Sequence, residues 1–480
     1  MSVAAIILAA GKGTRMRSAR AKVLHEIAGE PMIARVIRSV RALAPDPLVV
    51  VVGHQAAEVE AAVAASDATS SCRFALQEPQ RGTGDSARCG LSEIAPTFNG
   101  EVLITYGDMP SISPATLRDF VESHRQSGAK LSFISIRLAD PAAYGRVIRD
   151  SAGRVISIRE ARDASPAERA IGEINTGVYL VEASLLRSAL ANLKPNNAQK
   201  EYYLTDIVAD AVSRGEKVAA WIAHDPAEFA GINSREELAS MEKQTRETIN
   251  RKLMDAGVTL IDPATAYISE QAAIAPDCVI GPNVQILGKC KIGAGVKMDG
   301  TAWLSNVTVG ARSHLKLGVR AEDCTIGEDC DIGPFAHLRA GTELLGHNRI
   351  GNFVETKKAR LGHGSKASHL SYLGDATIGD DTNVGCGVIT VNYDGYEKHH
   401  TTIGDRCMVG CDTQLVAPVK VGDDVYVASG TTILREVPNG ALAMSHHPQR
   451  EKLGWVANWR RRHNDTRAVN GEHQAEIKSK

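Results

Sequence analysis

A six-residue repeat constrains this chain more than any other feature of its sequence. From about residue 260, aliphatic residues recur at every sixth position, often with a small residue four positions after each. The aliphatic positions are Ile280, Ile286 and Ile292; Ile326, Ile332, Leu338, Leu344 and Ile350; and Ile403, Val409, Leu415, Val421, Val427 and Ile433. This pattern predicts a parallel β-helix, in which each hexad forms a flat face and turns these residues inward.

The repeat also accounts for most of the cysteines. Of nine cysteines, five occupy the small inward position of a hexad: Cys278, Cys290, Cys324, Cys330 and Cys407. We therefore interpret these five as packing residues. No CxxC motif or cluster of histidines accompanies them, so the sequence shows neither a zinc signature nor a secreted disulfide framework.

The repeat is interrupted twice, between Thr356 and Ile378 and again over residues 391–402. Hexapeptide repeats break where a loop or a functional site is inserted. Beyond the repeat, residues 464–480 are polar and without periodicity, which predicts a disordered tail.

Residues 1–230 follow a different pattern, in which short apolar runs alternate with helical periodicity. Strands are predicted at 4–8, 48–52, 73–76, 102–106 and 131–137, helices at about 32–43, 55–65, 84–93 and 114–127, and a hairpin over 147–149 and 155–159. The alternation predicts an α/β domain with a parallel sheet flanked by helices. Such sheets bind ligands at the carboxyl ends of their strands.

A helix is predicted to begin at Ser234, since Ser234–Glu237 matches a capping box. Its apolar residues form one narrow stripe, which is compatible with an arm between domains or with a surface helix of the first domain. The predicted organisation is a domain over 1–233, a linker helix over 234–257, a β-helix over 258–463 and the tail over 464–480.

Length and charge exclude several classes of protein. The 480 residues are too many for one core, and 55 Lys and Arg against 56 Asp and Glu give a net charge of -1. That balance argues against a nucleic-acid-binding protein and against a polybasic membrane binder. No apolar run could span a bilayer and no signal peptide is recognised, so we expect a cytoplasmic protein.

A glycine-rich basic loop, Gly11–Arg15, follows the first predicted strand. Its glycines permit close backbone approach to a ligand, and exposed N–H groups beside Lys12 and Arg15 suit a polyphosphate. The loop matches neither a Walker A motif nor G-x-G-x-x-G, and a glycine pair after a strand is also compatible with a simple tight turn.

Other polar residues in this half suit nucleotide and sugar chemistry. Asp108 follows a predicted strand, where its carboxylate would hold a divalent cation or cap a turn. Gln77 with Gly82 and Thr83 could read a base edge, and Glu160 and Asn175 could bind sugar hydroxyls. Taken singly, each is also compatible with an ordinary solvated or turn residue.

Together these motifs resemble one enzyme family over about residues 3–455. They are Leu8–Met16, Lys22–His25, Gln77, Gly82–Gly84, Tyr106–Asp108, Tyr144–Arg146, Glu160, Glu173–Gly177 and Gly231–Asn233. The family is that of bacterial bifunctional N-acetylglucosamine-1-phosphate uridylyltransferase/glucosamine-1-phosphate acetyltransferases. The resemblance implies a Rossmann-like nucleotidyltransferase domain, a left-handed β-helix and a homotrimer with acetyl sites between neighbouring β-helices.

The resemblance also implies roles for residues of the first domain. Leu8, Ala9, Ala10, Gly11, Gln77, Gly82 and Thr83 would hold UTP, Arg15 and Lys22 its triphosphate, Gly145, Glu160 and Asn175 the sugar, and Asp108 and Asn233 Mg²⁺, with Tyr106 and Gly107 in the same site. N-acetylglucosamine-1-phosphate would then attack the α-phosphorus of UTP in line, with pyrophosphate leaving. No protein nucleophile is needed, since positioning and charge neutralisation carry the rate.

Lys358–Asp375, where the hexads slip, resembles the acetyltransferase segment of the family. By this resemblance His369 would be the base, Arg339 and Lys357 would bind the phosphate of glucosamine-1-phosphate, Tyr372 and Asn383 would orient the sugar, and Cys386, Asn392, Tyr393, Cys411, Ser429 and His446 would meet acetyl-CoA. Considered alone, Arg339 and Lys357 are compatible with solvated charges on a face, and Tyr372 with a residue at the rim.

Four coenzyme positions depart from the family pattern, which often has Ala, Ser, Ala and Arg at Cys386, Cys411, Ser429 and His446. His446 replaces a permanent cation, which puts tight acetyl-CoA binding in doubt, although Arg450 or Lys452 could compensate. Cys386 and Cys411 could be reactive thiols near the coenzyme, but packing is our preferred interpretation.

The leading hypothesis is a two-site enzyme that acetylates glucosamine-1-phosphate and then uridylylates the product to UDP-N-acetylglucosamine. One alternative is a single-activity sugar-1-phosphate nucleotidyltransferase with a structural or regulatory β-helix. A third, non-enzymatic interpretation makes the β-helix only a trimerisation stalk. The His369 segment argues against the single-activity alternative, because a scaffold needs no such insertion.

Overall fold

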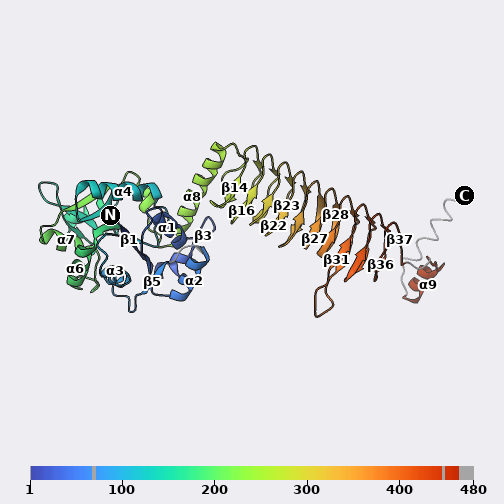
Figure 1. Ribbon diagram of the computed structural model, residues 1–480, viewed down its shortest axis with the longest axis horizontal. Coiled ribbons are helices and arrows are strands. Elements are labelled where there is room, and N and C mark those ends of the chain that lie inside the picture. The colour runs from blue at the N-terminus through green and yellow to red at the C-terminus, as the bar shows by residue number, and fades with distance from the viewer. Residues whose placement is uncertain (1, 67–71, 446–448, 464–480) are drawn as a thin grey trace. The chain divides into compact units, whose positions relative to one another are not determined.

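A computed structural model describes residues 2–66, 72–445 and 449–463, which form two compact units. The first unit runs to Ala272 and includes Gln285–Lys289, and the second comprises Ala273–Val284 and the chain from Cys290 on. Figure 1 labels the elements of both units. Among the described residues no helix is long and apolar enough to cross a membrane. The predicted tail and His446 lie outside the described residues.

The first unit contains every strand and helix predicted for it, with ends within two residues of the prediction. Its strands are β1 (Val3–Leu8), β2 (Glu26–Ile27), β3 (Glu30–Pro31), β4 (Leu48–Val52), β5 (Arg73–Leu76), β6 (Glu101–Tyr106), β7 (Leu131–Arg137), β8 (Arg146–Arg149), β9 (Val155–Arg159), β10 (Glu173–Glu182), β11 (Val218–Ile222), β12 (Thr259–Leu260), β13 (Tyr267–Ile268) and β16 (Gln285–Leu287). Its α-helices are α1 (Met32–Arg41), α2 (Ala56–Ser66), α3 (Thr83–Ser92), α4 (Pro114–Ser127), α5 (Pro166–Arg169), α6 (Ala183–Asn192), α7 (Asp206–Ser213) and α8 (Arg235–Asp255).

The main sheet of this unit is mixed, which corrects the predicted parallel sheet. Its order is β11-β7-β10-β6-β1-β4-β5, and β1 pairs in parallel with both β4 and β6. Strand β10 runs antiparallel to both β6 and β7. Strand direction cannot be read from local periodicity, because a doubly covered strand is an apolar run in either direction.

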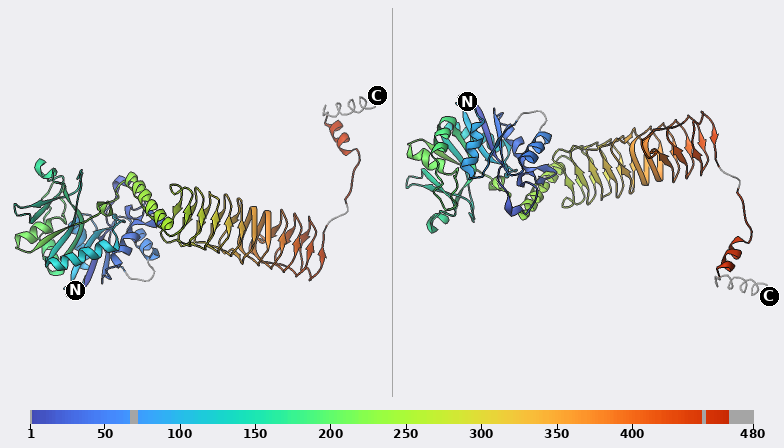
Figure 2. Two further views of the ribbon diagram at one scale, coloured as in Figure 1. Left: turned by 90° about the horizontal axis from the view of Figure 1, so that it is seen from above. Right: turned by 90° about the horizontal axis from the view of Figure 1, so that it is seen from below.

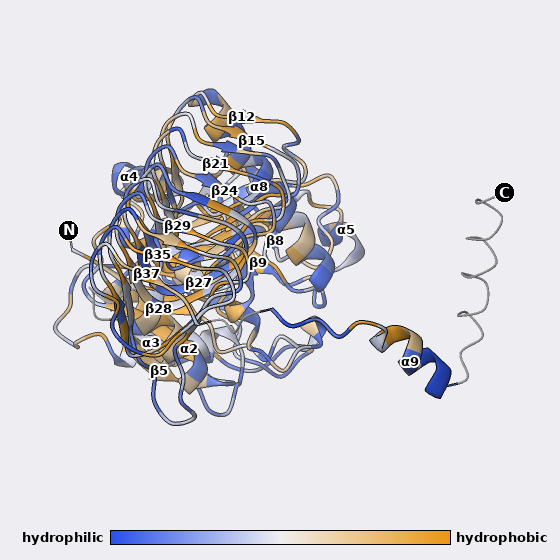
Figure 3. Ribbon diagram, turned by 90° about the vertical axis from the view of Figure 1, so that its right-hand side faces the viewer, coloured by the Kyte–Doolittle hydropathy of each residue, from blue (hydrophilic) through white to orange (hydrophobic). Residues whose placement is uncertain are grey.

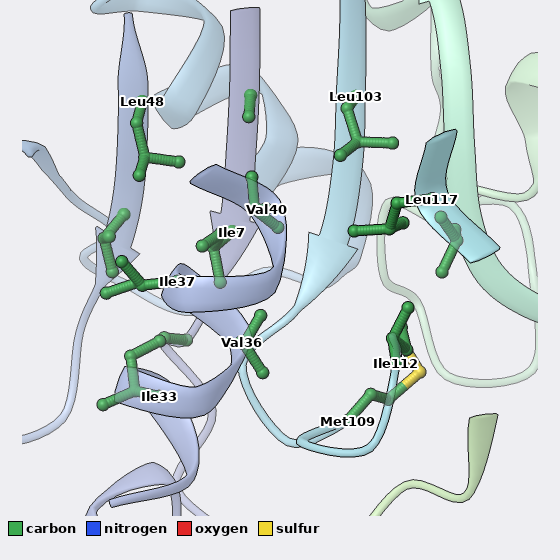
Figure 4. Packing of buried hydrophobic residues seen from close by; sticks show 14 of the residues in the cluster. Ile7, Ile33, Val36, Ile37, Val40, Leu48, Leu103, Met109, Ile112 and Leu117 are labelled. Carbon is green, nitrogen blue, oxygen red and sulfur yellow. The ribbon is translucent and has the colours of Figure 1, made fainter. Parts of the chain in front are cut away.

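Helices cover both faces of the sheet. Successive side chains of β1 point to opposite faces and so belong to two different buried clusters. Ala5 and Ile7 belong to one buried cluster, whereas Ala4, Ile6 and Leu8 belong to the other. Figure 4 shows the first cluster, where Ile33 and Ile37 of α1 face Ile7 and Leu48 of the sheet. With both faces buried, ligand contact is left to the loops at the strand ends.

The predicted helix at Ser234 is α8, and its capping box is formed by Ser234 and Glu237. Met241 of α8 is buried with Ile27, Met32 and Ile232 of the first unit. The surface-helix interpretation is therefore the better description of the N-terminal half of α8. Gly257, at φ +90°, follows the helix in a conformation that glycine adopts without strain.

The second unit is a stack of short parallel strands (Figures 1 and 2). They are β14 (Ala273–Ile274), β15 (Val279–Ile280), β17 (Lys291–Ile292), β18 (Lys297–Met298), β19 (Trp303–Ser305), β20 (Thr308–Val309), β21 (His314–Leu315), β22 (Arg320–Glu322), β23 (Thr325–Ile326), β24 (Asp331–Ile332), β25 (His337–Leu338), β26 (Glu343–Leu344), β27 (Arg349–Leu361), β28 (Lys366–Ile378), β29 (Asn383–Val384), β30 (Ile389–Val391), β31 (Thr401–Ile403), β32 (Met408–Val409), β33 (Gln414–Val416), β34 (Val419–Val421), β35 (Tyr426–Val427), β36 (Thr432–Ile433) and β37 (Leu442–Ala443). Helix α9 (Trp455–Arg462) follows and has no buried residue.

The hexapeptide prediction is confirmed by burial. All the aliphatic residues of the repeat are buried, and so are the five cysteines interpreted as packing residues. Figure 3 colours the coils by hydropathy and shows orange and blue segments alternating along them. The slip in the repeat corresponds to β27 and β28, two long strands that pair with each other in parallel.

Two faces of the β-helix, with the corner between them, hold most of the residues predicted for acetyl transfer. Face A carries β25, Glu355–Lys357 of β27, Tyr372–Gly374 of β28, and then β30, β33 and β36. Face B carries β24, the starts of β27 and β28, and then β29, β32 and β35. The chain passes from face B to face A in every coil through a short corner, here called the B–A corner.

Candidate functional site

The first unit holds two adjoining cavities at the carboxyl ends of β1 and β6. The first cavity has a volume of about 390 Å³, and its lining includes Leu8, Ala9, Ala10, Gly11, Lys22, Gln77, Gly82, Thr83, Tyr106 and Asp108. The second cavity has a volume of about 370 Å³, and its lining includes Arg15, Tyr106, Asp108, Glu160, Asn175 and Asn233. Tyr106 and Asp108 line both, so the two cavities meet at the end of β6.

Parallel pairing explains why these loops meet. Leu8 of β1 lies opposite Tyr106 of β6, and Gly107 N–H donates to the Leu8 carbonyl at 2.9 Å. A Cβ at Gly107 would stand 3.0 Å from Ile33 and 3.2 Å from Ala9 and Val23. Glycine therefore lets β6 end against the glycine-rich loop, which places Asp108 at the mouth of both cavities.

Gln77 is held in one orientation in the first cavity. Its Nε2 donates to the Gly82 carbonyl at 3.0 Å and to Asp85 Oδ2 at 3.1 Å. Both amide hydrogens are thereby used inside the protein, which leaves Oε1 to accept a hydrogen bond. Gln77 is thus suited to accept from an N–H donor on the edge of a base.

Asp108 and Asn233 converge on one cation. Lys22 Nζ forms an ion pair with Asp108 Oδ2 and donates to Asn233 Oδ1 at 3.1 Å. The segment that carries Asn233 is fixed nearby, because Ile232 N–H donates to the Asp108 carbonyl at 3.0 Å. The three side chains come from separate parts of the chain and form one site between the cavities.

The second cavity presents a buried polar wall. Glu160 accepts a hydrogen bond from Thr205 Oγ1 at 3.1 Å, and burial raises the pKa of its carboxyl. Asn175 donates to Tyr179 Oη at 2.7 Å, and its backbone N–H donates to the Gly145 carbonyl at 2.9 Å. These contacts orient one carboxylate and one amide for binding hydroxyl groups.

Tyr106 separates the two cavities and is held on both sides. A hydrogen bond joins it to Thr83, and burial raises the pKa of its phenol. A Cβ at Gly177 would stand 2.3 Å from the Tyr106 ring, so only glycine fits there. Thr83 and Gly177 thus position this ring.

In the second unit, face A brings cations together. Arg339 and Lys357 follow paired residues of β25 and β27, and Arg339 forms an ion pair with Glu355 at 2.7 Å. Lys398 lies against Lys357 and, with Arg339, lowers the pKa of the Lys357 ammonium. Because these three positive charges repel one another, the binding of an anion beside them is favoured. Tyr372 lies on the same face, opposite Glu355.

His369 lies at the B–A corner, exposed and opposite Asn352 of the preceding coil. Its Nδ1 is 2.9 Å from Asn352 Oδ1. Because an amide oxygen only accepts, Nδ1 carries the proton and Nε2 is left with a free lone pair. Asn352 thus sets the tautomer that a base requires.

Asn383 is not on the face that carries Tyr372. It begins β29 on face B, opposite Lys366, and its Nδ2 lies 3.2 Å from Met408 Sδ. The residues predicted for the sugar are therefore divided between two faces of the β-helix. Tyr372 and Asn383 lie on adjacent faces, on either side of the B–A corner.

A loop over 392–400 leaves the end of face A, where the repeat was predicted to lapse (Figure 1, beside β31). Asn392 Nδ2 donates to Asp375 Oδ2 at 2.6 Å, and Tyr393 Oη donates to the Gly395 carbonyl at 2.6 Å. His400 Nε2 lies 2.9 Å from Thr377 Oγ1. Tyr393 itself is exposed at the rim.

Cys386, Cys411 and Ser429 stand at the same corner as His369, in the coils after that residue. Both cysteines are exposed. The preferred packing interpretation of Cys386 and Cys411 is therefore wrong, because at the corner these side chains point away from the core. The coenzyme position predicted at His446 lies outside the described residues.

The structure reveals partners that the sequence analysis missed. Asp85 orients Gln77, Thr205 contacts Glu160, Asn352 contacts His369, and Lys398 adds a cation beside Lys357. None of these residues belongs to a recognisable local motif. Only the loop that interrupts the repeat, which contains Lys398, carried a signal in the sequence.

Three family models match parts of the chain. The MobA-like NTP transferase domain matches residues 5–174, the GMPPB C-terminal domain residues 263–348, and the bacterial transferase hexapeptide (six repeats) residues 400–435. The first covers most of the lining of both cavities but ends just before Asn175, and it leaves out Glu201 and Asn233. The third lies in the part of the β-helix beyond His369.

Curated relatives match almost the whole chain. Bifunctional protein GlmU of Pelobacter propionicus is 48% identical over 454 residues, covering 95% of this chain and 98% of the relative. Bifunctional protein GlmU of Trichlorobacter lovleyi is 46% identical over 452 residues, covering 94% of this chain and 97% of the relative. A solved structure of a putative glucose-1-phosphate thymidylyltransferase from Bacillus anthracis covers 51% of this chain and 96% of its own, at 19% identity and a TM-score of 0.41.

Proposed function

Because the chain belongs to the bifunctional GlmU family, we propose that its two sites make UDP-N-acetylglucosamine in two steps. The second unit acetylates glucosamine-1-phosphate with acetyl-CoA. The first unit then transfers UMP from UTP to N-acetylglucosamine-1-phosphate and releases pyrophosphate. The product is a cell-envelope precursor, and we place both reactions in the cytoplasm. The observation that carries the assignment is the convergence of Asp108, Asn233 and Lys22 where the two cavities meet.

Asp108 and Asn233 fit a magnesium site. Their oxygens already share one cation, the Lys22 ammonium, and they supply one carboxylate and one amide oxygen. Mg²⁺ prefers such a sparse oxygen set, since it keeps waters and takes its other ligands from phosphates. When bound there, Mg²⁺ would neutralise charge on the triphosphate.

In the uridylyl site the chain positions two reactants. Gln77 Oε1 accepts from the uracil edge, and the loop from Gly11 to Arg15 turns N–H groups and a cation toward the phosphates. Glu160 and Asn175 orient the sugar in the second cavity. The sugar phosphate oxygen then attacks the α-phosphorus near Asp108, where the cavities meet, and pyrophosphate leaves.

In the acetyl site His369 acts as the general base. The amine of glucosamine-1-phosphate is mostly protonated near neutrality and must lose a proton before it attacks a thioester. His369 Nε2 takes that proton, while Arg339, Lys357 and Lys398 hold the phosphate. The amine forms a bond with the acetyl carbon, and coenzyme A leaves as the thiol.

An exposed apolar stripe along the B–A corner supports the proposed homotrimer. Leu317, Phe335, Phe353 and Leu370 occupy one position of four successive coils, and each is 45–60% exposed. The rings of Phe335 and Phe353 are stacked, with their centroids 5.8 Å apart. Both phenylalanines have positive φ, a conformation that is costly for bulky residues. We propose that other copies of this chain cover the stripe. Because the stripe runs beside His369, this packing would bring face B of one copy to face A of another.

Phe353→Asp is expected to dissociate the trimer and to abolish acetyl transfer, with uridylyl transfer unchanged. Burial of one phenylalanine contributes about 1.5–3 kcal/mol, and three copies would each lose that contribution. Sedimentation and both activity assays test the prediction. Leu434→Asp is the matched control, because Leu434 is 71% exposed at a different corner. A fully active monomeric acetyltransferase would contradict the proposed trimer.

The two activities are expected to separate into fragments, residues 1–233 for uridylyl transfer and residues from about 235 for acetyl transfer. This division matches the proposed domains, 1–233, the α8 linker of 234–257, and 258–463. Met241 packs onto Ile27, Met32 and Ile232. A fragment of residues 1–255 should therefore have a larger free energy of unfolding in urea than the fragment of residues 1–233, by roughly 2 kcal/mol or more. Dependence of each activity on the intact chain would refute the separation.

The proposed function is tested by two assays on the full chain. We expect thiol release from acetyl-CoA only when glucosamine-1-phosphate is present, and pyrophosphate release from UTP only with N-acetylglucosamine-1-phosphate. Pyrophosphate release without any thiol release would leave a single-activity nucleotidyltransferase with a structural β-helix. Absence of both would refute the assignment.

A further inference from the structure

Two exposed cysteines occupy equivalent positions in neighbouring coils of the β-helix. Asn383 pairs with Met408 and Val384 with Val409, so the same register places Cys386 directly over Cys411. Backbone hydrogen bonds flank the pair, from Gly385 N–H to the Val409 carbonyl at 2.8 Å and from Asp412 N–H to the Cys386 carbonyl at 2.7 Å. Neighbouring parallel strands hold their Cα atoms about 4.8 Å apart. That spacing lies within the range of roughly 4.4–6.8 Å that a disulfide spans.

These two cysteines differ from every other cysteine of the chain. Of the nine, only Cys386 and Cys411 are exposed. Burial raises the pKa of the thiols of Cys278, Cys324, Cys330 and Cys407, which makes these inward cysteines poor nucleophiles. A packing role therefore accounts for the inward cysteines and not for the stacked pair.

We propose that Cys386 and Cys411 form a reversible disulfide within one chain, which lowers acetyl transfer when the surroundings become oxidising. The oxidant is a low-molecular-weight disulfide such as glutathione disulfide. One cysteine thiolate attacks a sulfur of that disulfide, forms a mixed disulfide and releases one thiol. The other cysteine thiolate then attacks the protein-bound sulfur and releases the second thiol. The protein loses two hydrogens, and the small disulfide is reduced to two thiols.

The consequence for acetyl transfer rests on the proposed function of the corner. His369 lies one coil before Cys386 at the same position, and both cysteines lie where acetyl-CoA is proposed to bind. A bridge fixes two neighbouring coils to each other beside the base and removes both thiols from the surface proposed to bind the coenzyme. Misplacement of reacting groups by about 1 Å can cost a hundredfold in rate. The uridylyl site, in the other unit, contains neither cysteine.

The test uses the full-length protein, treated with glutathione disulfide or with dithiothreitol and followed by intact mass, peptide mapping and both activity assays. We expect the oxidised protein to lose two hydrogens, to yield a Cys386–Cys411 crosslinked peptide, and to lose acetyl transfer by roughly tenfold to a hundredfold. Dithiothreitol should restore the activity, and uridylyl transfer should not change.

Variants identify the responsible thiols, each compared with itself before and after oxidation. Cys386→Ser with Cys411→Ser should abolish the response, and either change alone should leave one stable glutathione adduct. Cys89→Ser, which removes a part-buried thiol of the first unit, should keep the full response.

Three results would overturn the proposal: two glutathione adducts without a bridge, a bridge between chains, or a bridged protein with unchanged acetyl transfer. A protein that forms the bridge on oxidation, but that acetylates nothing even when reduced, would support the proposed disulfide and refute the acetyltransferase assignment. The two failures are therefore distinguishable.

Discussion

Asp108→Ala abolishes uridylyl transfer and leaves acetyl transfer intact; this is the first result that we expect from mutagenesis. Asp108 is the only carboxylate that lines both cavities among the described residues. Its loss removes the charged half of the proposed Mg²⁺ site and leaves Lys22 with a single amide partner. Removing charge stabilisation of this kind from a phosphoryl-transfer site costs roughly three orders of magnitude in rate.

The measurement is pyrophosphate release as a function of magnesium concentration, with thiol release from acetyl-CoA recorded on the same protein. Asn233→Ala should behave in the same way, because its amide oxygen faces the same cation at 3.1 Å from Lys22 Nζ. Asp119→Ala is the matched control, since Asp119 is an exposed carboxylate of α4 away from both cavities. If Asn233→Ala kept full uridylyl activity with unchanged magnesium dependence, the metal assignment would be wrong.

His369→Ala is expected to lower the turnover of acetyl transfer by roughly two to four orders of magnitude, the usual contribution of a general base. The side chain is exposed and gives up little packing, so the fold should survive. Uridylyl transfer should not change. His363→Ala is the matched control, because it removes another exposed histidine of the same segment.

Asn352 should act through His369 as a positioning residue. Asn352→Ala removes the acceptor at 2.9 Å that keeps the proton on Nδ1. We expect a smaller loss of turnover than in His369→Ala, together with a changed pH profile of acetyl transfer. Near wild-type turnover of His369→Ala with a normal pH profile would remove His369 from its role as the base.

The β-helix and most of the first sheet were predictable from sequence for the same physical reason. A hexad or an alternating run reports the environment of each side chain along its own strand, whichever strand becomes its neighbour. The buried hexad residues, the five inward cysteines and the capping box of α8 follow from such local patterns. The resemblance of motifs then supplied the roles of residues such as Asp108 and His369.

Strand direction and side-chain partners required the tertiary structure. Strand β10 is buried over most of its length, and only its place between β6 and β7 reveals that it is antiparallel. Lys22, Asp108 and Asn233 are up to 211 residues apart and meet because the segments that carry them come together at the carboxyl end of β6. No local pattern encodes such a meeting.

Cys386 and Cys411 show most clearly what the sequence determines and what the tertiary structure decides. The repeat assigns each residue to an inward or an outward position, but the length of each coil decides which outward residues stack. His369 stacks on Asn352, 17 residues earlier, whereas the coil that contains the 392–400 loop separates paired residues by 25. That longer coil brings Cys411 into register with Cys386. The sequence alone determined that the chain forms coils and that the five hexad cysteines point inward, whereas the register of those coils, set by backbone hydrogen bonds between distant residues, decided which thiols lie side by side.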